Sequence, residues 1–169
     1  MRRLIAIVLA GLCLSLTLLS PVSVKAFNAR TPTNETWIAV NGDLKPVRVI
    51  KVLDDGSQLL EGRLVVTAQT RGSVTAHKPY YHRNSSGTIL WTATVTGTFT
   101  YNGTTASCTN ASYSTEVNAS TWSEQSGTAY PSGNTAIADV VMMRKLLFIV
   151  VETVPVTIPL TCDKNGNLS

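Results

Sequence analysis

The chain is 169 residues long and carries 14 lysines and arginines against 10 aspartates and glutamates, which gives a formal net charge of +4. Three of those cations, Arg2, Arg3 and Lys25, lie within the first 26 residues, where no acidic residue occurs. The rest of the chain is therefore almost neutral, and it lacks the clustered basic residues that nucleic-acid binding requires. Composition thus argues against nucleic acid as a partner.

Residues 1–26 have the order of a secretory signal peptide. Two arginines precede an apolar run at residues 4–19, and Pro21 and the small residue Ala26 follow it. This order of charge, apolar core and cleavage site predicts export with cleavage after Ala26. An uncleaved anchor is the alternative, because the apolar run approaches the ~20 residues that cross a bilayer. We expect a secreted, extracellular protein or one held at the cell surface, with no membrane partner after cleavage.

Two of the three cysteines, Cys108 and Cys162, lie outside the leader. Outside the cell an isolated pair predicts a disulfide, which on a chain-entropy estimate stabilises a fold by roughly 4 kcal/mol. A reactive thiol or a metal ligand would need a histidine or a further cysteine close in sequence, and neither is present. We therefore expect a Cys108–Cys162 disulfide, no metal and no cofactor.

The first part of the exported chain has little sustained periodicity. Residues 27–41 are rich in polar residues and proline, which predicts a poorly ordered N-terminus. In residues 47–69, two apolar segments flank an Asp-Gly pair at Asp55, which is typical of a hairpin turn; a short helix is the alternative, weakened by its glycines. Residues 71–87 are polar and contain Pro79, so we expect a linker or a long loop there.

The pattern sharpens at residues 88–101, where threonine occupies every second position from 92 to 100. A period of two predicts a half-buried strand. Asn102-Gly103 is the commonest pair in a two-residue hairpin turn, so residues 104–114 should return antiparallel to this strand. The positions between the threonines form an aromatic stripe that we expect in the core: Trp91, Phe99 and Tyr101.

The C-terminal part continues with short apolar and turn segments. Residues 118–133 are rich in turn formers and end in a reversal, after which residues 136–142 alternate until Arg144-Lys145 interrupts the apolar run. In the final segment, residues 146–162, apolar side chains occupy one face, and Pro155 and Pro159 lie on the other. Because proline cannot donate to a ladder, this strand should have at least one unpaired edge.

These segments predict an all-β fold, either an antiparallel sandwich or a small open barrel over residues 88–162. Short strands separated by turns must bury one face against another sheet. The Cys108–Cys162 bond would join the first hairpin to the last strand and close the core. We expect three regions: a signal peptide at residues 1–26, an N-terminal tail, hairpin and linker at 27–83, and the β domain at 84–169.

Candidate binding residues are few. A threonine-rich face is the ordinary composition of an exposed strand. A hydroxyl surface that docks a saccharide would need the array repeated on neighbouring strands, and residues 104–114 supply hydroxyls without a strict ladder. Aromatic residues in loops are where a sugar or peptide site would start, although a loop aromatic can also fold back on the core. The weak candidates are Tyr80, Tyr81 and Trp122.

Catalysis has little support in the sequence. His77 and His82 are the only histidines, and no carboxylate is close to either of them in sequence. A metal site would need a third or fourth ligand. Phosphate-loop, nucleophile-elbow and calcium-loop motifs are all missing. We therefore predict no catalytic residues and no enzyme activity.

Three stretches resemble a known group of proteins: "LWTATVTGTFTYNGTTASCT", "GNTAIADVVMMRK" and the ending "VPVTIPLTCDKNGNLS". They are similar to small secreted proteins of Gram-positive bacteria, many from the gut, which share the alternating strand, two cysteines and a Cys-Asp-x-x-Gly tail. The resemblance covers residues 84–169. It implies a secreted bacterial β domain and carries over no catalytic or binding residues.

Taken together, these features predict a secreted, non-enzymatic β domain that binds a saccharide, a cell-wall polymer or a protein. A structural or protective envelope module without a specific ligand is the first alternative. A small secreted hydrolase, whose carboxylates would converge only in the fold, is the second.

Overall fold

The computed structural model describes residues 36–40 and 43–169, and these residues form ten β-strands and no helix. They belong to one compact unit. The expected signal peptide at 1–26 and residues 27–35 of the expected N-terminal tail lie outside the described residues. Residues 36–40, which the sequence assigns to the same tail, form a strand instead.

Seven of the strands make one antiparallel sheet, sheet A, in the order β1-β2-β3-β5-β6-β7, with β4 paired to β5. β3 and β4 pair with the same edge of the long β5, β4 with its first residues (73–77) and β3 with its last (80–83). The seven strands are β1 (Thr36–Val40), β2 (Asp43–Val52), β3 (Gln58–Gly62), β4 (Val65–Thr70), β5 (Ser73–Arg83), β6 (Ile89–Tyr101) and β7 (Ala106–Val117).

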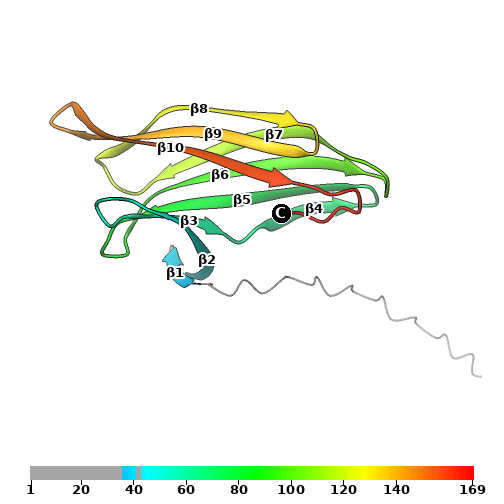
Figure 1. Ribbon diagram of the computed structural model, residues 1–169, viewed down its shortest axis with the longest axis horizontal. Helices are drawn as coiled ribbons and strands as arrows, with labels where there is room; N and C mark the ends of the chain where they lie inside the picture. Colours follow the sequence, from blue (N-terminus) through cyan, green and yellow to red (C-terminus); the bar gives the residue numbers. More distant parts are fainter. Residues whose placement is uncertain (1–35, 41–42) are drawn as a thin grey trace, which may run out of the picture. The chain divides into compact units, whose positions relative to one another are not determined.

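The last three strands form sheet B, which is also antiparallel and has the order β10-β9-β8. They are β8 (Trp122–Ser132), β9 (Thr135–Leu146) and β10 (Ile149–Thr161). Sheet B packs across β5, β6 and β7 (Figure 1). The prediction of an all-β fold is confirmed, with two packed sheets and no closed barrel among the described residues.

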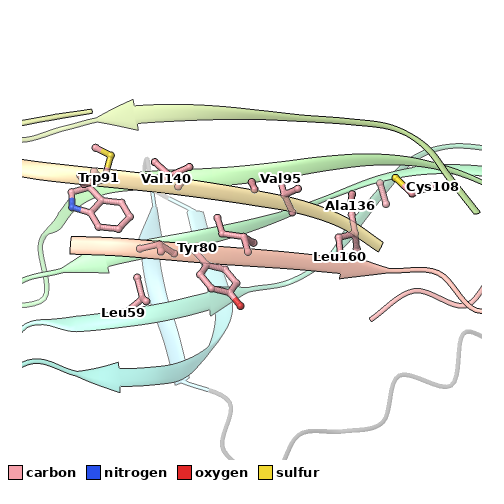
Figure 2. Packing of buried hydrophobic residues seen from close by; sticks show 14 of the residues in the cluster. Leu59, Tyr80, Trp91, Val95, Cys108, Ala136, Val140 and Leu160 are labelled. Atoms are coloured by element: carbon pink, nitrogen blue, oxygen red, sulfur yellow. The ribbon is translucent and has the colours of Figure 1, made fainter. Parts of the chain in front are cut away.

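The core fills the space between the two sheets (Figure 2). Successive side chains of a strand point to opposite faces, so every second residue is buried along β6, along β9 up to Met142 and along β10 from Val154 to Leu160. The threonine strand thus buries its other stripe, with Trp91 and Phe99 fully enclosed as predicted. Facing residues from sheet B are Ala136, Ala138, Val140, Met142, Val154, Val156, Ile158 and Leu160.

Gly97 lies where β6 closely approaches Ala136 of sheet B. A Cβ atom at this position would lie 2.8 Å from the Cβ of Ala136 and 2.6 Å from Cζ of Phe99. We expect Gly97→Ala to overpack the core and to lower the free energy of unfolding by about 1–3 kcal/mol, measured by urea denaturation. Gly127→Ala is the comparison variant, because the atoms nearest to its new Cβ belong to the ring end of half-buried Tyr113, which can move aside more easily than the core. Equal losses in the two variants would contradict this account of the core.

The predicted hairpins are confirmed where local turn chemistry fixes them. β2 and β3 pair around Gly56, which has a φ of 78°; the amide of Leu53 donates to Ser57, so three residues form this turn. β6 and β7 also pair as a hairpin, but Tyr101 pairs with Ala106, so residues 102–105 form the connection and the expected two-residue Asn102-Gly103 turn is wrong. β10 has a partner on one side only, so its prolines occupy an edge strand as predicted.

The prediction of a linker at residues 71–87 is wrong. Most of this segment is β5, whose alternate residues are buried and which pairs with β6 along its whole length. The expected boundary at residue 84 therefore falls inside sheet A. The prediction failed because it treated Pro79 as a strand breaker. β3 pairs with β5 from Tyr80 onward and β4 pairs with it up to His77. Pro79 lies between these two pairings, where no described strand needs a backbone donor on that edge of β5.

Candidate functional site

The outer face of sheet A carries a hollow of about 550 Å3. Its floor is the threonine stripe of β6, in particular Thr92, Thr94 and Thr96. These side chains point away from the core because they alternate with the buried residues of the same strand. The stripe is thus the base of a concave surface rather than an open, flat strand face.

Strand register extends the polar floor to both neighbours of β6. Opposite Thr94 lie Ser114 on β7 and Pro79 on β5, and opposite Thr96 lie Ser112 and His77. Directly paired residues lie on the same face of a sheet. The repetition on a neighbouring strand that a hydroxyl docking surface needs, and that the sequence did not reveal, is therefore present between β6 and β7.

Tyr81 forms one wall of the hollow. It pairs with Thr92, is only 4% exposed, and belongs to a small second cluster with Ile38, Val47, Leu60 and Ile89. Gly62 makes room for the ring, because a Cβ there would collide with Tyr81. Burial, and secondarily the charge of Glu116, raises the pKa of Tyr81, so its hydroxyl stays protonated at neutral pH and can both donate and accept.

The rim of the hollow is charged. Lys45 from β2 and Arg63 from the β3–β4 connection lie on one side, and Glu116 from β7 lies on the other. His77 also lines the site. Hydroxyl, phenol, cationic and carboxylate groups therefore converge on one concave surface, which suits a ligand with many hydroxyls and an acidic group.

The other two candidate binding residues do not reach this surface. Tyr80 faces the core from β5, and Trp122, predicted in a loop, is the first residue of β8; they are 7% and 5% exposed. Burial and the nearby Glu61 raise the pKa of Tyr80 to about 12. The interpretation of both as loop aromatics available to a ligand is wrong, because each lies on a strand and points between the sheets.

A cation is also buried between the sheets. Lys78 is 6% exposed, and its Nζ lies 3.2 Å from Oε1 of Glu61 and 2.9 Å from the carbonyl oxygen of Pro159. Arg48 pairs with the same carboxylate. This group joins β5 to the edge strand β10, so we assign it to the packing of the sheets and not to ligand binding.

Ser57 and His82 form a hydrogen bond of 3.0 Å between Oγ and Nε2. Asp55, which lies near them, accepts the amide of Ser57 instead of bonding to His82 Nδ1, and Nδ1 has no partner. Ser57 is 1% exposed, and His82 is fully buried against Trp91 and Trp122. A substrate cannot reach this pair, so its geometry is that of a core contact.

The described residues contain neither a metal-binding cluster nor a membrane-spanning helix. No group of three or more histidine, cysteine or carboxylate side chains is arranged to hold a metal in this part of the chain. The same ranges contain no helix that could span a bilayer.

Comparisons with known protein families, with curated proteins and with solved structures found no match to the chain. The hollow on sheet A must therefore be interpreted from its own residues.

Proposed function

We propose that this protein is a secreted, non-enzymatic β domain that binds a saccharide or cell-wall polymer in the hollow on sheet A. The single observation that carries the proposal is the hydroxyl floor of β6 and β7 beside the Tyr81 ring, within one concave surface. Hydroxyls both donate and accept, so they match the hydroxyls of a sugar, and half-buried Pro79 supplies apolar contact. Lys45 and Arg63 favour a polymer that carries carboxylate or phosphate groups.

The extracellular setting of this proposal rests on the sequence. The order of charge, apolar core and cleavage site in residues 1–26 supports export. The resemblance of residues 84–169 to small secreted two-cysteine proteins of Gram-positive bacteria supports a bacterial wall polymer as the ligand class. The proposed Cys108–Cys162 disulfide suits an oxidising environment outside the cell.

The test is binding of the purified protein to an array of bacterial and host glycans and wall polymers. We expect Thr94→Val, combined with Thr96→Val, to weaken binding by tenfold or more, on the order of 1.4 kcal/mol, because two floor hydroxyls are lost with little change of shape. Tyr81→Phe should weaken it also, since the ring remains and only its hydroxyl goes. The readout is the dissociation constant for the tightest ligand of the array.

Thr100→Val is the matched control. Thr100 lies on the same strand and the same face as the floor threonines but outside the hollow, and it is exposed. It should bind like the unmodified protein. Binding that survives the loss of both floor hydroxyls, or no binding to any glycan or wall polymer, would remove the support for this function and favour a protein ligand or a structural role.

A further inference from the structure

The β9–β10 hairpin extends beyond the rest of sheet B. β8 begins at Trp122, which pairs with Arg144, so from Leu146 onward β10 is the only strand among the described residues that pairs with β9. Figure 1 shows this hairpin projecting past the ends of the neighbouring strands. We call its end, residues 146–151, the β9–β10 tip.

The tip is an unbroken run of six exposed apolar residues. Leu147 and Phe148 at the turn are 90% and 99% exposed, so almost none of their apolar surface is covered. Exposed apolar clusters of this kind mark interaction sites in proteins that are otherwise folded around a core. The other four residues are Leu146, Ile149, Val150 and Val151.

The turn itself departs from ordinary hairpin chemistry. Leu146 pairs with Ile149, which leaves a two-residue turn in which Leu147 has a φ of 49° and Phe148 a φ of 70°. Asn-Gly is favoured in such turns because bulky side chains resist positive φ. Elsewhere in the described residues only glycines have a positive φ. Two large apolar residues are thus held in a disfavoured conformation at the most exposed point of the hairpin, a combination typical of functional positions.

The distribution of apolar residues indicates what covers the tip. A ribbon that docks in a protein groove buries one face, and its residues then alternate between apolar and polar. At the tip both faces and the turn are apolar, so the partner must surround it, as the acyl region of a lipid layer does. Lys145 is exposed directly beside the apolar run, while Arg144 is paired with Glu152 at 3.6 Å.

We propose that the β9–β10 tip inserts into the interfacial region of a lipid bilayer that carries anionic headgroups, with Lys145 among the headgroups. Insertion must be shallow, because beyond Trp122 no described residue pairs with either outer edge of the ribbon, and the backbone groups there need water or headgroups. The sequence predicted no membrane partner for the exported chain, and this inference departs from that expectation. It concerns a different surface from the hollow on sheet A.

The experiment is vesicle co-sedimentation of protein collected from the culture medium, with phosphatidylglycerol–phosphatidylcholine vesicles and with pure phosphatidylcholine vesicles. We expect binding that is stronger to the anionic vesicles. The double variant Leu147→Asn, Phe148→Gly should bind at least about tenfold more weakly, because two large apolar side chains are lost. The same variant should melt at the same or a higher temperature, because Asn-Gly relieves the turn.

Two further variants make the test specific. Val52→Ser removes an apolar side chain that is 57% exposed on β2, outside the tip, and it should leave vesicle binding unchanged. Phe148→Trp should show a blue shift of its emission with vesicles and quenching by brominated lipid. Absence of vesicle binding, or unchanged binding of the Asn-Gly variant, would overturn the proposal. The proposal would also be overturned if the unmodified protein binds no lipid but self-associates, and the Asn-Gly variant is a monomer. The tip would then be a contact between copies of this chain.

Discussion

Protein collected from the culture medium is expected to carry a disulfide between Cys108 and Cys162. Its reduction is expected to lower the free energy of unfolding by roughly 4 kcal/mol, because the bond closes a long loop and restricts the unfolded chain. Mass spectrometry without reductant should show the two cysteine peptides linked, and urea denaturation with and without reductant should give the difference in stability. Two free thiols in the secreted protein would contradict the prediction.

The fold brings the two cysteines to the same turn. The amide of Cys108 donates to the carbonyl of Gly133 at 2.8 Å, and the amide of Cys162 donates to the carbonyl of the adjacent Asn134 at 3.0 Å. Both residues are buried and belong to the same core cluster, although the structure contains them as free thiols. The fold therefore brings together the two backbone segments that the expected disulfide would join, and the bond itself stays a prediction.

The thiols also indicate when the bond should form. Burial raises the pKa of both cysteines, and the neighbouring Asp163 and Cys108 raise that of Cys162 further. Since the thiolate is the reactive form, a protein that folds in the reduced state should oxidise slowly. The control is a double variant, Cys108→Ala with Cys162→Ala, whose stability should not respond to reductant. A reductant effect in that variant would assign the loss to another cause.

The sequence predicted those strands in which apolar and polar residues alternate regularly. β6 and the C-terminal half of β10 place apolar residues inside and threonine or proline outside, and the turns beside β6 contain glycines at positive φ. In these segments neighbouring residues decide both the conformation and the face that is buried. The sequence therefore predicted these strands, the β6–β7 hairpin and the edge position of β10.

β5 was missed because its buried polar residues have partners far away in sequence. Lys78 is compensated by Glu61 and by the carbonyl of Pro159, and His82 bonds to Ser57. Without these partners, a segment with a lysine and a histidine in its inward stripe has the composition of a loop. The same reason explains the hollow, since Arg63, Tyr81 and Glu116 meet only through the pairing of β3, β5, β6 and β7.

The exposure of the β9–β10 tip could not be predicted from the sequence either. Residues 146–151 are an apolar run within a strand-like segment, a pattern that fits a buried strand as well as an exposed one. The decisive fact is that β8 begins only opposite Arg144, which leaves the end of the hairpin uncovered on that side. The lengths and the register of the strands, and not the composition of residues 146–151, therefore decide that this segment is exposed.

Acid is expected to destabilise the fold through His82. Burial lowers the pKa of His82 below the ordinary value of 6.5, and the nearby Asp55 opposes this only in part. Below about pH 6.5 the unfolded chain takes up a proton at this position and the folded chain does not, so the free energy of unfolding should fall as the pH drops toward the folded pKa. Each unit between the two pKa values corresponds to about 1.4 kcal/mol.

The double variant Ser57→Ala, His82→Phe tests the source of this loss. It replaces both partners of the buried hydrogen bond by apolar groups and keeps an aromatic ring against Trp91 and Trp122, so stability at pH 7.5 should change little. Between pH 7.5 and pH 5, the thermal midpoint of this variant should fall less than that of the unmodified protein. His77→Gln, which alters the half-buried histidine of the hollow, should keep the original slope. If the double variant keeps the slope of the unmodified protein, protonation of His82 is not the cause of the loss of stability in acid.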